Sequence, residues 1–179
     1  MIECLMTNST AWAKGSEAMI PQGIVIHSSG FEQPYLWYFV QPSNSDPHKI
    51  DILDIIGINK KHTDYNHTYR RNNYHYWIGK DAEGEVRVVQ TFPNSFDISN
   101  DKFIHICILE DDLKNKDYVL HIIAKLAPLC AQLCEEFNFP SNKIYDHSEL
   151  SNMPDANYWL CRYGYCAKDI RQIVKNLTL

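Results

Sequence analysis

The sequence predicts an α/β protein in which helices flank a central mixed β-sheet. Three observations support this prediction: short apolar runs bounded by Pro or Gly, one pair of alternating runs around a turn, and two stretches with apolar residues at helical spacing. Strands that alternate with helices are typical of a sheet covered by helices, because each element must bury an apolar face. With 179 residues, the chain is expected to form a single domain over residues 1–179.

The expected strands follow one another along the chain. The apolar run within Pro21–Gly30 predicts a buried strand that ends at His27. Residues 74–80 and 85–92 alternate around the turn D-A-E-G and predict a β-hairpin. Phe103–Leu109 is apolar and rich in β-branched residues, which predicts a further strand.

The remaining elements are a short strand and the helices. Lys143–His147 predicts a short last strand. Asp117–Phe137 repeats apolar residues at helical spacing and predicts a long helix, in which Pro128 should cause a kink or cost about 3 kcal/mol. Ala167–Leu177 predicts a final amphipathic helix, and a short helix is expected around Ile50–Ile56.

Composition excludes several classes of function. The net charge of −5 without a basic run argues against a nucleic-acid partner and against attraction to an anionic membrane. No apolar run approaches the length of a transmembrane helix, and the first residues lack the charged and apolar regions of a signal peptide. The sequence gives no information on oligomeric state.

The cysteines do not form the dense framework of a small secreted domain. Cys130 and Cys134 lie four residues apart in the apolar helical pattern and are expected to be reduced core residues. Cys161 and Cys166 flank a glycine in a loop, where we expect free thiols rather than a disulfide, although a disulfide is possible.

Two histidines stand out because each ends a predicted strand, where sheet proteins often build sites. His27 ends the first buried strand and His147 ends the last one. Seven residues separate His147 from Asp155, so a loop could return that carboxylate to the histidine. A catalytic zinc site uses three protein ligands and a water, which these side chains could supply. The alternative is that all three are ordinary polar residues, since such spacings occur in many proteins.

Seven blocks of the chain carry a resemblance to a known family, and they are, in order, M-T-N-S-T-A-W-A-K-G, I-P-Q-G-I-V-I-H-S-S-G, Y-L-W-Y-F-V-Q-P, H-Y-W-I-G-K-D-A-E-G-E-V-R-V-V-Q-T-F-P, I-Y-D-H-S-E, N-M-P-D-A-N-Y-W and R-Y-G-Y-C-A-K-D-I-R. In these blocks the chain resembles the type 2 N-acetylmuramoyl-L-alanine amidases, whose fold is shared by peptidoglycan recognition proteins, and most of all the phage and clostridial cell-wall amidases. The order of the blocks is more specific than any one of them. The resemblance implies an amidase-like or peptidoglycan-recognition-protein-like fold.

The resemblance also implies a metal site and an activity. His27, His147 and Asp155 match the family's three zinc ligands. Zinc-bound water would attack the amide between N-acetylmuramic acid and L-alanine of peptidoglycan. Tyr74 matches a cleft tyrosine that could hydrogen-bond the oxyanion, although it could equally be a plain aromatic at a strand end. Glu149 is a second catalytic candidate, which could instead only brace its loop.

The chain also departs from the family pattern. Many relatives have a glutamate in the strand that here reads I-H-I-C-I, where Cys107 takes its position, and Met153 replaces a polar residue near the third ligand. Glu110 and His105 are nearby candidates for the missing group, and His105 could face either the cleft or the helices.

These departures leave two functional predictions. The first is a zinc-dependent amidase that hydrolyses peptidoglycan, an endolysin held in the cytoplasm until release or an enzyme acting at the cell wall. The alternative is a catalytically impaired protein that binds muropeptides on the same fold. Aromatic side chains could stack on sugar rings or belong to the core, and these are Tyr35, Trp37, Tyr38, Tyr76, Trp77, Tyr158 and Trp159.

Overall fold

A computed structural model gives the fold of the chain. It describes residues 2–4, 17–36, 74–81, 83–112, 114–151 and 156–178. The helix expected around Ile50–Ile56 lies outside these residues, as do Met153 and Asp155.

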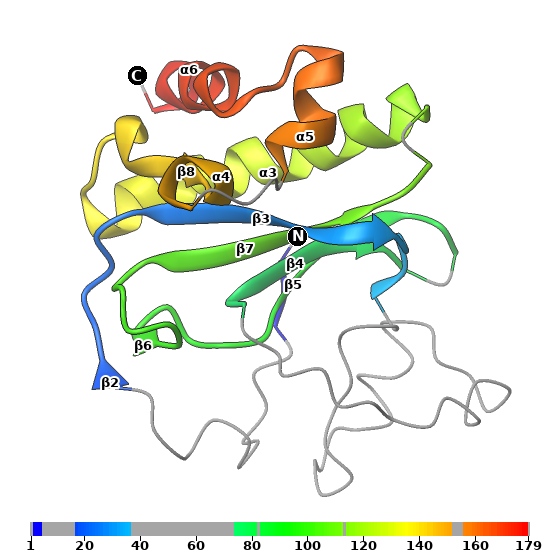
Figure 1. Cartoon of the computed structure of the whole chain (residues 1–179). Helices are drawn as coiled ribbons and strands as arrows, with labels where there is room; N and C mark the ends of the chain where they lie inside the picture. Colours follow the sequence, from blue (N-terminus) through cyan, green and yellow to red (C-terminus); the bar gives the residue numbers. More distant parts are fainter. Residues whose placement is uncertain are drawn as a thin grey trace, which may run out of the picture.

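Within the described residues, the central feature is a six-stranded sheet with the order β1-β5-β4-β7-β3-β8 (Figure 1). Its strands are β1 (Ile2–Cys4), β3 (Ile24–Glu32), β4 (Tyr76–Lys80), β5 (Val86–Gln90), β7 (Ile104–Glu110) and β8 (Ile144–Asp146). Only β4 and β5 pair in antiparallel fashion, as the predicted hairpin, and the other neighbours are parallel. The sheet is therefore mixed, as predicted. A separate small antiparallel pair joins β2 (Glu17–Ala18) and β6 (Phe96–Asp97).

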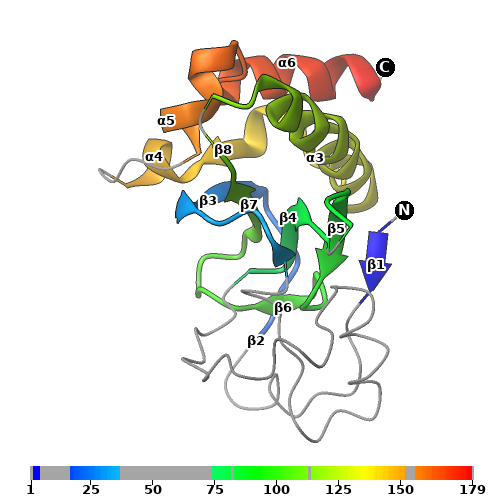
Figure 2. The same ribbon diagram turned by 90° about the vertical axis from the view of Figure 1, so that its right-hand side faces the viewer.

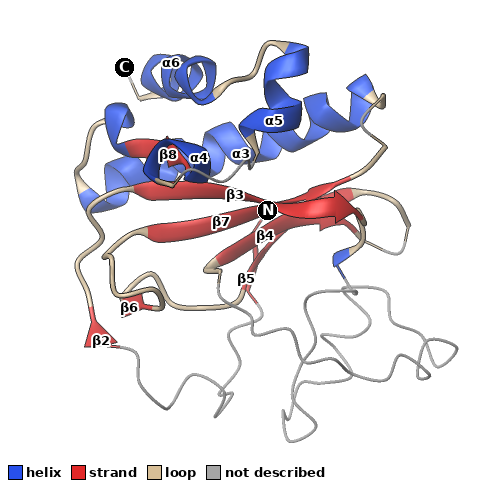
Figure 3. Cartoon of the chain, in the orientation of Figure 1, coloured by secondary structure: helices blue, strands red, loops and turns tan. Residues whose placement is uncertain are grey.

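The described helices lie together on one side of the sheet (Figures 1 and 2). They are α3 (Lys116–Phe137), α4 (His147–Leu150), α5 (Asn157–Leu160) and α6 (Ala167–Leu177), with 3-10 helices at Ser141–Lys143 and Cys161–Tyr163. Figure 3 shows how α3 and α6 cross above the long strands. The sheet flanked by helices confirms the predicted fold class.

Strand alternation separates two faces of the sheet. Ile24, Ile26, Ile104 and Ile106 belong to the apolar core shared with α3 and α6. The intervening residues of β3 and β7 point to the opposite face, since side chains alternate along a strand. The parallel register pairs Val25 with His105 and His27 with Cys107, so histidines from two neighbouring strands share that face. The structure thus places His105 on the side away from the helices.

Helix α3 is the main helix of the core. It begins after Asn115, whose side chain accepts a hydrogen bond from the Tyr118 amide, and ends at Asn138 in the left-handed conformation. The helix continues through Pro128, and the kink or energetic cost expected at this residue stays a prediction. Pro128 lies on the exposed side of α3, where water can hydrogen-bond the carbonyl group that loses its helical partner.

By length and apolar composition, α3 is also the one helix among the described residues that could cross a membrane. Its apolar residues, however, pack into the core between the sheet and α6. This burial is typical of the central helix of a globular domain.

Two strand boundaries and the disulfide differ from the predictions. Strand β3 continues past His27 to Glu32 with an irregular register after Ser28, and His147 begins α4 rather than ending β8. Cys161 and Cys166 form a disulfide with a Cα–Cα distance of 4.4 Å. The turn that brings them together contains Gly164 at φ +81°, a conformation that favours glycine.

Candidate active site

A cavity of about 360 Å³ opens on the sheet face that carries the histidines. Its lining residues come from β3, from β7, from the loop before β7, from α4 and from the segment before β4. They are Val25, His27, Tyr74, Ser99, Asp101, His105, His147 and Leu150. The two histidines and the tyrosine predicted from the sequence are therefore brought together in one cavity.

His27 and His147 lie side by side in this cavity. Their ring centroids are 4.6 Å apart and the rings are tilted by 37°. The parallel register explains this proximity, because β3 and β8 are hydrogen-bonded neighbours in which Ile26 pairs with Asp146. Each histidine directly follows one of these paired residues, so both lie at the same level along the two strands.

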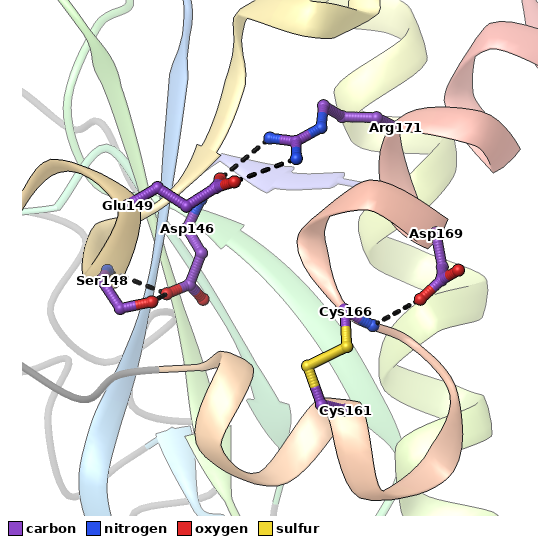
Figure 4. The surroundings of a disulfide bond; sticks show 7 residues. All are labelled: Asp146, Ser148, Glu149, Cys161, Cys166, Asp169 and Arg171. Carbon is purple, nitrogen blue, oxygen red and sulfur yellow. Dashed lines mark hydrogen bonds and ion pairs between the residues drawn. A yellow bond between two sulfur atoms is a disulfide. The ribbon is translucent and has the colours of Figure 1, made fainter.

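A helix cap fixes the backbone at His147. The side chain of Asp146 accepts hydrogen bonds from the amide and the hydroxyl of Ser148, the first of them at 2.9 Å, while Glu149 accepts one from the Asp146 amide at 3.0 Å (Figure 4). This reciprocal arrangement is a capping box, which stabilises a first helical turn. The turn starts at His147 and sets the direction in which that histidine leaves the strand.

Glu149 is also paired with α6. Both of its carboxylate oxygens accept hydrogen bonds from Arg171, at 2.8 and 2.9 Å (Figure 4). Partial burial alone would raise the pKa of Glu149, but the bonds from Arg171 and from the Asp146 amide outweigh it and lower that pKa. Glu149 does not line the cavity. Its catalytic role stays a prediction, and these contacts favour the alternative in which it braces the loop.

Tyr74 occupies the wall of the cavity next to His27. The two ring centroids are 4.9 Å apart, and Trp77 packs edge-on against the phenol ring at 4.9 Å. The backbone carbonyl of Tyr74 accepts a hydrogen bond of 2.8 Å from the Thr91 hydroxyl. These contacts hold the phenol beside the histidines.

His105 is the group of β7 that reaches the cavity. Its Nδ1 lies 2.9 Å from Nε2 of His27, and its Nε2 lies 3.0 Å from a carboxylate oxygen of Asp101. Burial lowers the pKa of His105 more than Asp101 raises it. The sequence indicated His105 only as a nearby residue of undetermined face. Asp101 gave no signal, since it lies in an irregular loop where Asn100 and Lys102 have positive φ.

The other groups considered at this strand lie elsewhere. Cys107 shares the face of His105 but is buried and does not line the cavity. Glu110 is also buried and accepts a hydrogen bond of 3.1 Å from the Gly30 amide, in the irregular part of β3. Among the aromatic candidates, Tyr76, Trp77 and Trp159 belong to the buried core.

The residues of this cavity supply part of the ligand set of a metal site. Two imidazoles at one cavity match two of the three protein ligands of a catalytic zinc centre. Among the described residues, no three His, Cys, Asp or Glu side chains converge on a common metal position. Asp155, the third ligand implied by the resemblance, lies outside them. The donor chemistry of His27 and His147 therefore fits zinc.

Comparison with known proteins identifies the family. The family model described as N-acetylmuramoyl-L-alanine amidase matches residues 17–158. The chain belongs to this family. No curated protein matches this chain.

Several solved structures share the fold of this chain. The PlyG catalytic domain aligns with a TM-score of 0.63 at 13% identity, covering 100% of this chain and 96% of that one. PlyL aligns with a TM-score of 0.61 at 12% identity, covering 98% and 97%. The Staphylococcus aureus hydrolase AmiA, solved in complex with its ligand, aligns with a TM-score of 0.60 at 14% identity, covering 100% and 83%. At these identities the likeness concerns the fold, and the family match supports a hydrolytic amidase that acts on peptidoglycan.

Proposed function

We propose that the chain is a zinc-dependent amidase that hydrolyses the bond between N-acetylmuramic acid and L-alanine, with His27, His147 and Asp155 as metal ligands. The observation that carries the proposal is the meeting of His27, His147 and Tyr74 in one cavity of about 360 Å³, in a member of the amidase family. Zinc held by these residues would lower the pKa of a bound water and would polarise the amide carbonyl.

The residues of the chain would contribute binding and orientation. Tyr74 stands beside His27 in the cavity, and its phenol could donate a hydrogen bond to the oxyanion of a bound substrate. Trp77 packs against the ring of Tyr74 and Thr91 bonds its backbone carbonyl, so both the ring and the backbone of Tyr74 would be restrained before the substrate arrives. The capped turn after Asp146 similarly fixes where His147 can point.

The proposal extends to where the protein acts. Its substrate would be the peptidoglycan of a cell wall, so the enzyme would work at the wall, as an endolysin after release from the cytoplasm or in remodelling of the wall.

The decisive experiment measures metal content and product release in one preparation. We expect one zinc per chain, and chelator-sensitive release of L-alanine amino groups from purified peptidoglycan. His147→Ala should lose both the metal and the activity. A His147→Ala protein that keeps full zinc occupancy would contradict the metal assignment, whereas a wild-type protein that holds zinc but releases no product would support the muropeptide-binding alternative.

Tyr74→Phe tests the oxyanion donor separately. We expect a fall of about 10²- to 10³-fold in kcat with zinc retained, because the variant keeps the ring and loses only the hydroxyl group. Tyr35→Phe is the matched control, since Tyr35 is half-exposed and does not line the cavity. An unchanged kcat in Tyr74→Phe would assign Tyr74 to packing alone.

A further inference from the structure

We propose that Asp101 and His105 are positioning residues that fix the ring tautomer of His27, so that Nδ1 of His27 carries the lone pair offered to a metal. The inference deepens the proposed metal site and rests on it for the metal, while the tautomer itself is a property of the protein alone. Neither Asp101 nor His105 is among the ligands that the resemblance implies.

Three side chains form a continuous chain of hydrogen bonds. A carboxylate oxygen of Asp101 lies 3.0 Å from Nε2 of His105, and Nδ1 of His105 lies 2.9 Å from Nε2 of His27. Both histidines are buried, so water competes little for the hydrogen bond between them. These hydrogen bonds lead from the loop before β7, through β7, to β3.

The proton positions in this chain of hydrogen bonds follow from the Asp101 carboxylate at its end, which cannot donate. An ionised carboxylate only accepts hydrogen bonds, so the proton between Asp101 and His105 belongs to Nε2 of His105. A neutral imidazole has a single N–H, which leaves Nδ1 of His105 as an acceptor. The proton toward His27 therefore belongs to Nε2 of His27, and the lone pair of that ring lies on Nδ1.

Backbone hydrogen bonds hold Asp101 and His105 in place. The Asp101 amide donates to Asp97 at 3.1 Å, and the second hydrogen bond to the Asp101 carboxylate comes from the Phe103 amide at 3.0 Å. The backbone of His105 is bonded on both sides to His75, with its amide donating to the His75 ring at 3.0 Å and its carbonyl accepting from the His75 amide at 2.8 Å. The relay is thus anchored through the backbone of β7 and of the loop before it.

This arrangement matches a general feature of metal sites. A histidine that binds a metal through one nitrogen usually donates its other N–H to a fixed acceptor, and loss of that acceptor lowers metal affinity by about 10- to 100-fold. Here the acceptor is a second histidine, which is itself oriented by a carboxylate. His105 has both nitrogens occupied in this role, which distinguishes it from a ligand.

The first test uses metal-free wild-type protein with ¹⁵N-labelled histidine. Long-range ¹H–¹⁵N spectra distinguish the two neutral tautomers of each ring, and we expect His27 to be protonated on Nε2. Protonation of His27 on Nδ1 would overturn the relay, and this result does not depend on whether the protein is a zinc enzyme.

The second test adds ¹¹³Cd²⁺ as the metal probe. We expect scalar coupling from the metal to Nδ1 of His27, and coupling to Nε2 would overturn the proposal. A protein that binds no metal but shows the expected tautomer would contradict the proposed zinc site and leave the Asp101–His105 relay standing.

Variants separate positioning from simple packing. His105→Ala should weaken zinc binding about 10- to 100-fold, as measured by competition with a chromophoric chelator. His105→Asn, which keeps an acceptor near the position of Nδ1, should recover most of that affinity, and Asp101→Ala should give a smaller loss. His121→Ala is the matched control, because His121 is exposed on α3. Full affinity in His105→Ala, or an Asn variant no better than Ala, would refute the positioning role.

Discussion

Acid should destabilise this protein through His75, a histidine that the fold buries in its neutral form. His75 is fully buried, its Nε2 donates to the Phe96 carbonyl at 2.8 Å, and its Nδ1 accepts from the His105 amide at 3.0 Å. A second ring proton would have to face that amide N–H. Burial, together with the neighbouring His105, lowers the pKa of His75 from 6.5 to about 4, although the Phe96 carbonyl acts in the opposite direction.

The size and sign of the effect follow from proton linkage. Between these two pKa values the unfolded chain binds a proton at His75 that the folded protein does not, so the free energy of unfolding falls as the pH falls. The gap between 6.5 and about 4 corresponds to about 3 kcal/mol at about 1.4 kcal/mol per pH unit. The loss begins near pH 6.5 and levels off below about pH 4 for this group.

The measurement compares wild-type protein with His75→Gln by urea unfolding from pH 7 to pH 4, with chelator present to remove metal effects. The glutamine amide can still donate to the Phe96 carbonyl but does not titrate. Wild-type protein should be the more stable at pH 7, and its advantage should shrink by about 3 kcal/mol on acidification, while other titrating groups cancel in the difference. A difference that stays constant with pH would refute the buried neutral state of His75.

Three further perturbations test the surroundings of the site. Asp146→Ala should lower the free energy of unfolding by about 1 kcal/mol and weaken zinc binding, because it removes the cap that directs His147 into the cavity. Urea unfolding measures the first effect and chelator competition the second. An unchanged free energy of unfolding would count against the cap. Glu149→Gln should keep activity on peptidoglycan and cost less than about 1 kcal/mol, since its pairing with Arg171 is partly exposed; loss of activity at full zinc occupancy would instead support a catalytic role. Replacing both Cys161 and Cys166 by Ser should lower the free energy of unfolding by about 2 kcal/mol, the value expected for a short loop of this separation. Reductant should destabilise the wild-type protein by a similar amount in thermal unfolding and should not affect the double variant.

Local sequence patterns predicted most elements near their observed boundaries. Ala167–Leu177 was predicted as the helix that the structure contains, and the hairpin and the strand at Phe103–Leu109 match β4, β5 and β7 within about two residues. These predictions succeed because amphipathic spacing and turn residues are encoded within each segment. At Pro128 the local pattern predicts a kink or an energetic cost, and the size of that cost depends on whether that side of the helix faces water.

Residues on distant segments were harder to assign. The sequence placed His27 and His147 at strand ends, but the parallel register of β3 and β8 is what makes them neighbours. The disulfide depends on the turn at Gly164, and the role of Glu149 depends on Arg171, which comes from a separate helix. No local pattern specifies such pairings, because they arise only when the elements pack.

The sequence by itself determined the α/β class, the order of the elements, and the two histidines and the tyrosine that the cavity brings together. The tertiary structure alone decided that His105 faces the cavity and that Asp101 reaches it, since strand alternation fixes two faces but not which of them the helices cover. Helix α3 covers the isoleucine face because burying those side chains removes the most apolar surface from water, and this leaves the histidine face open for the site.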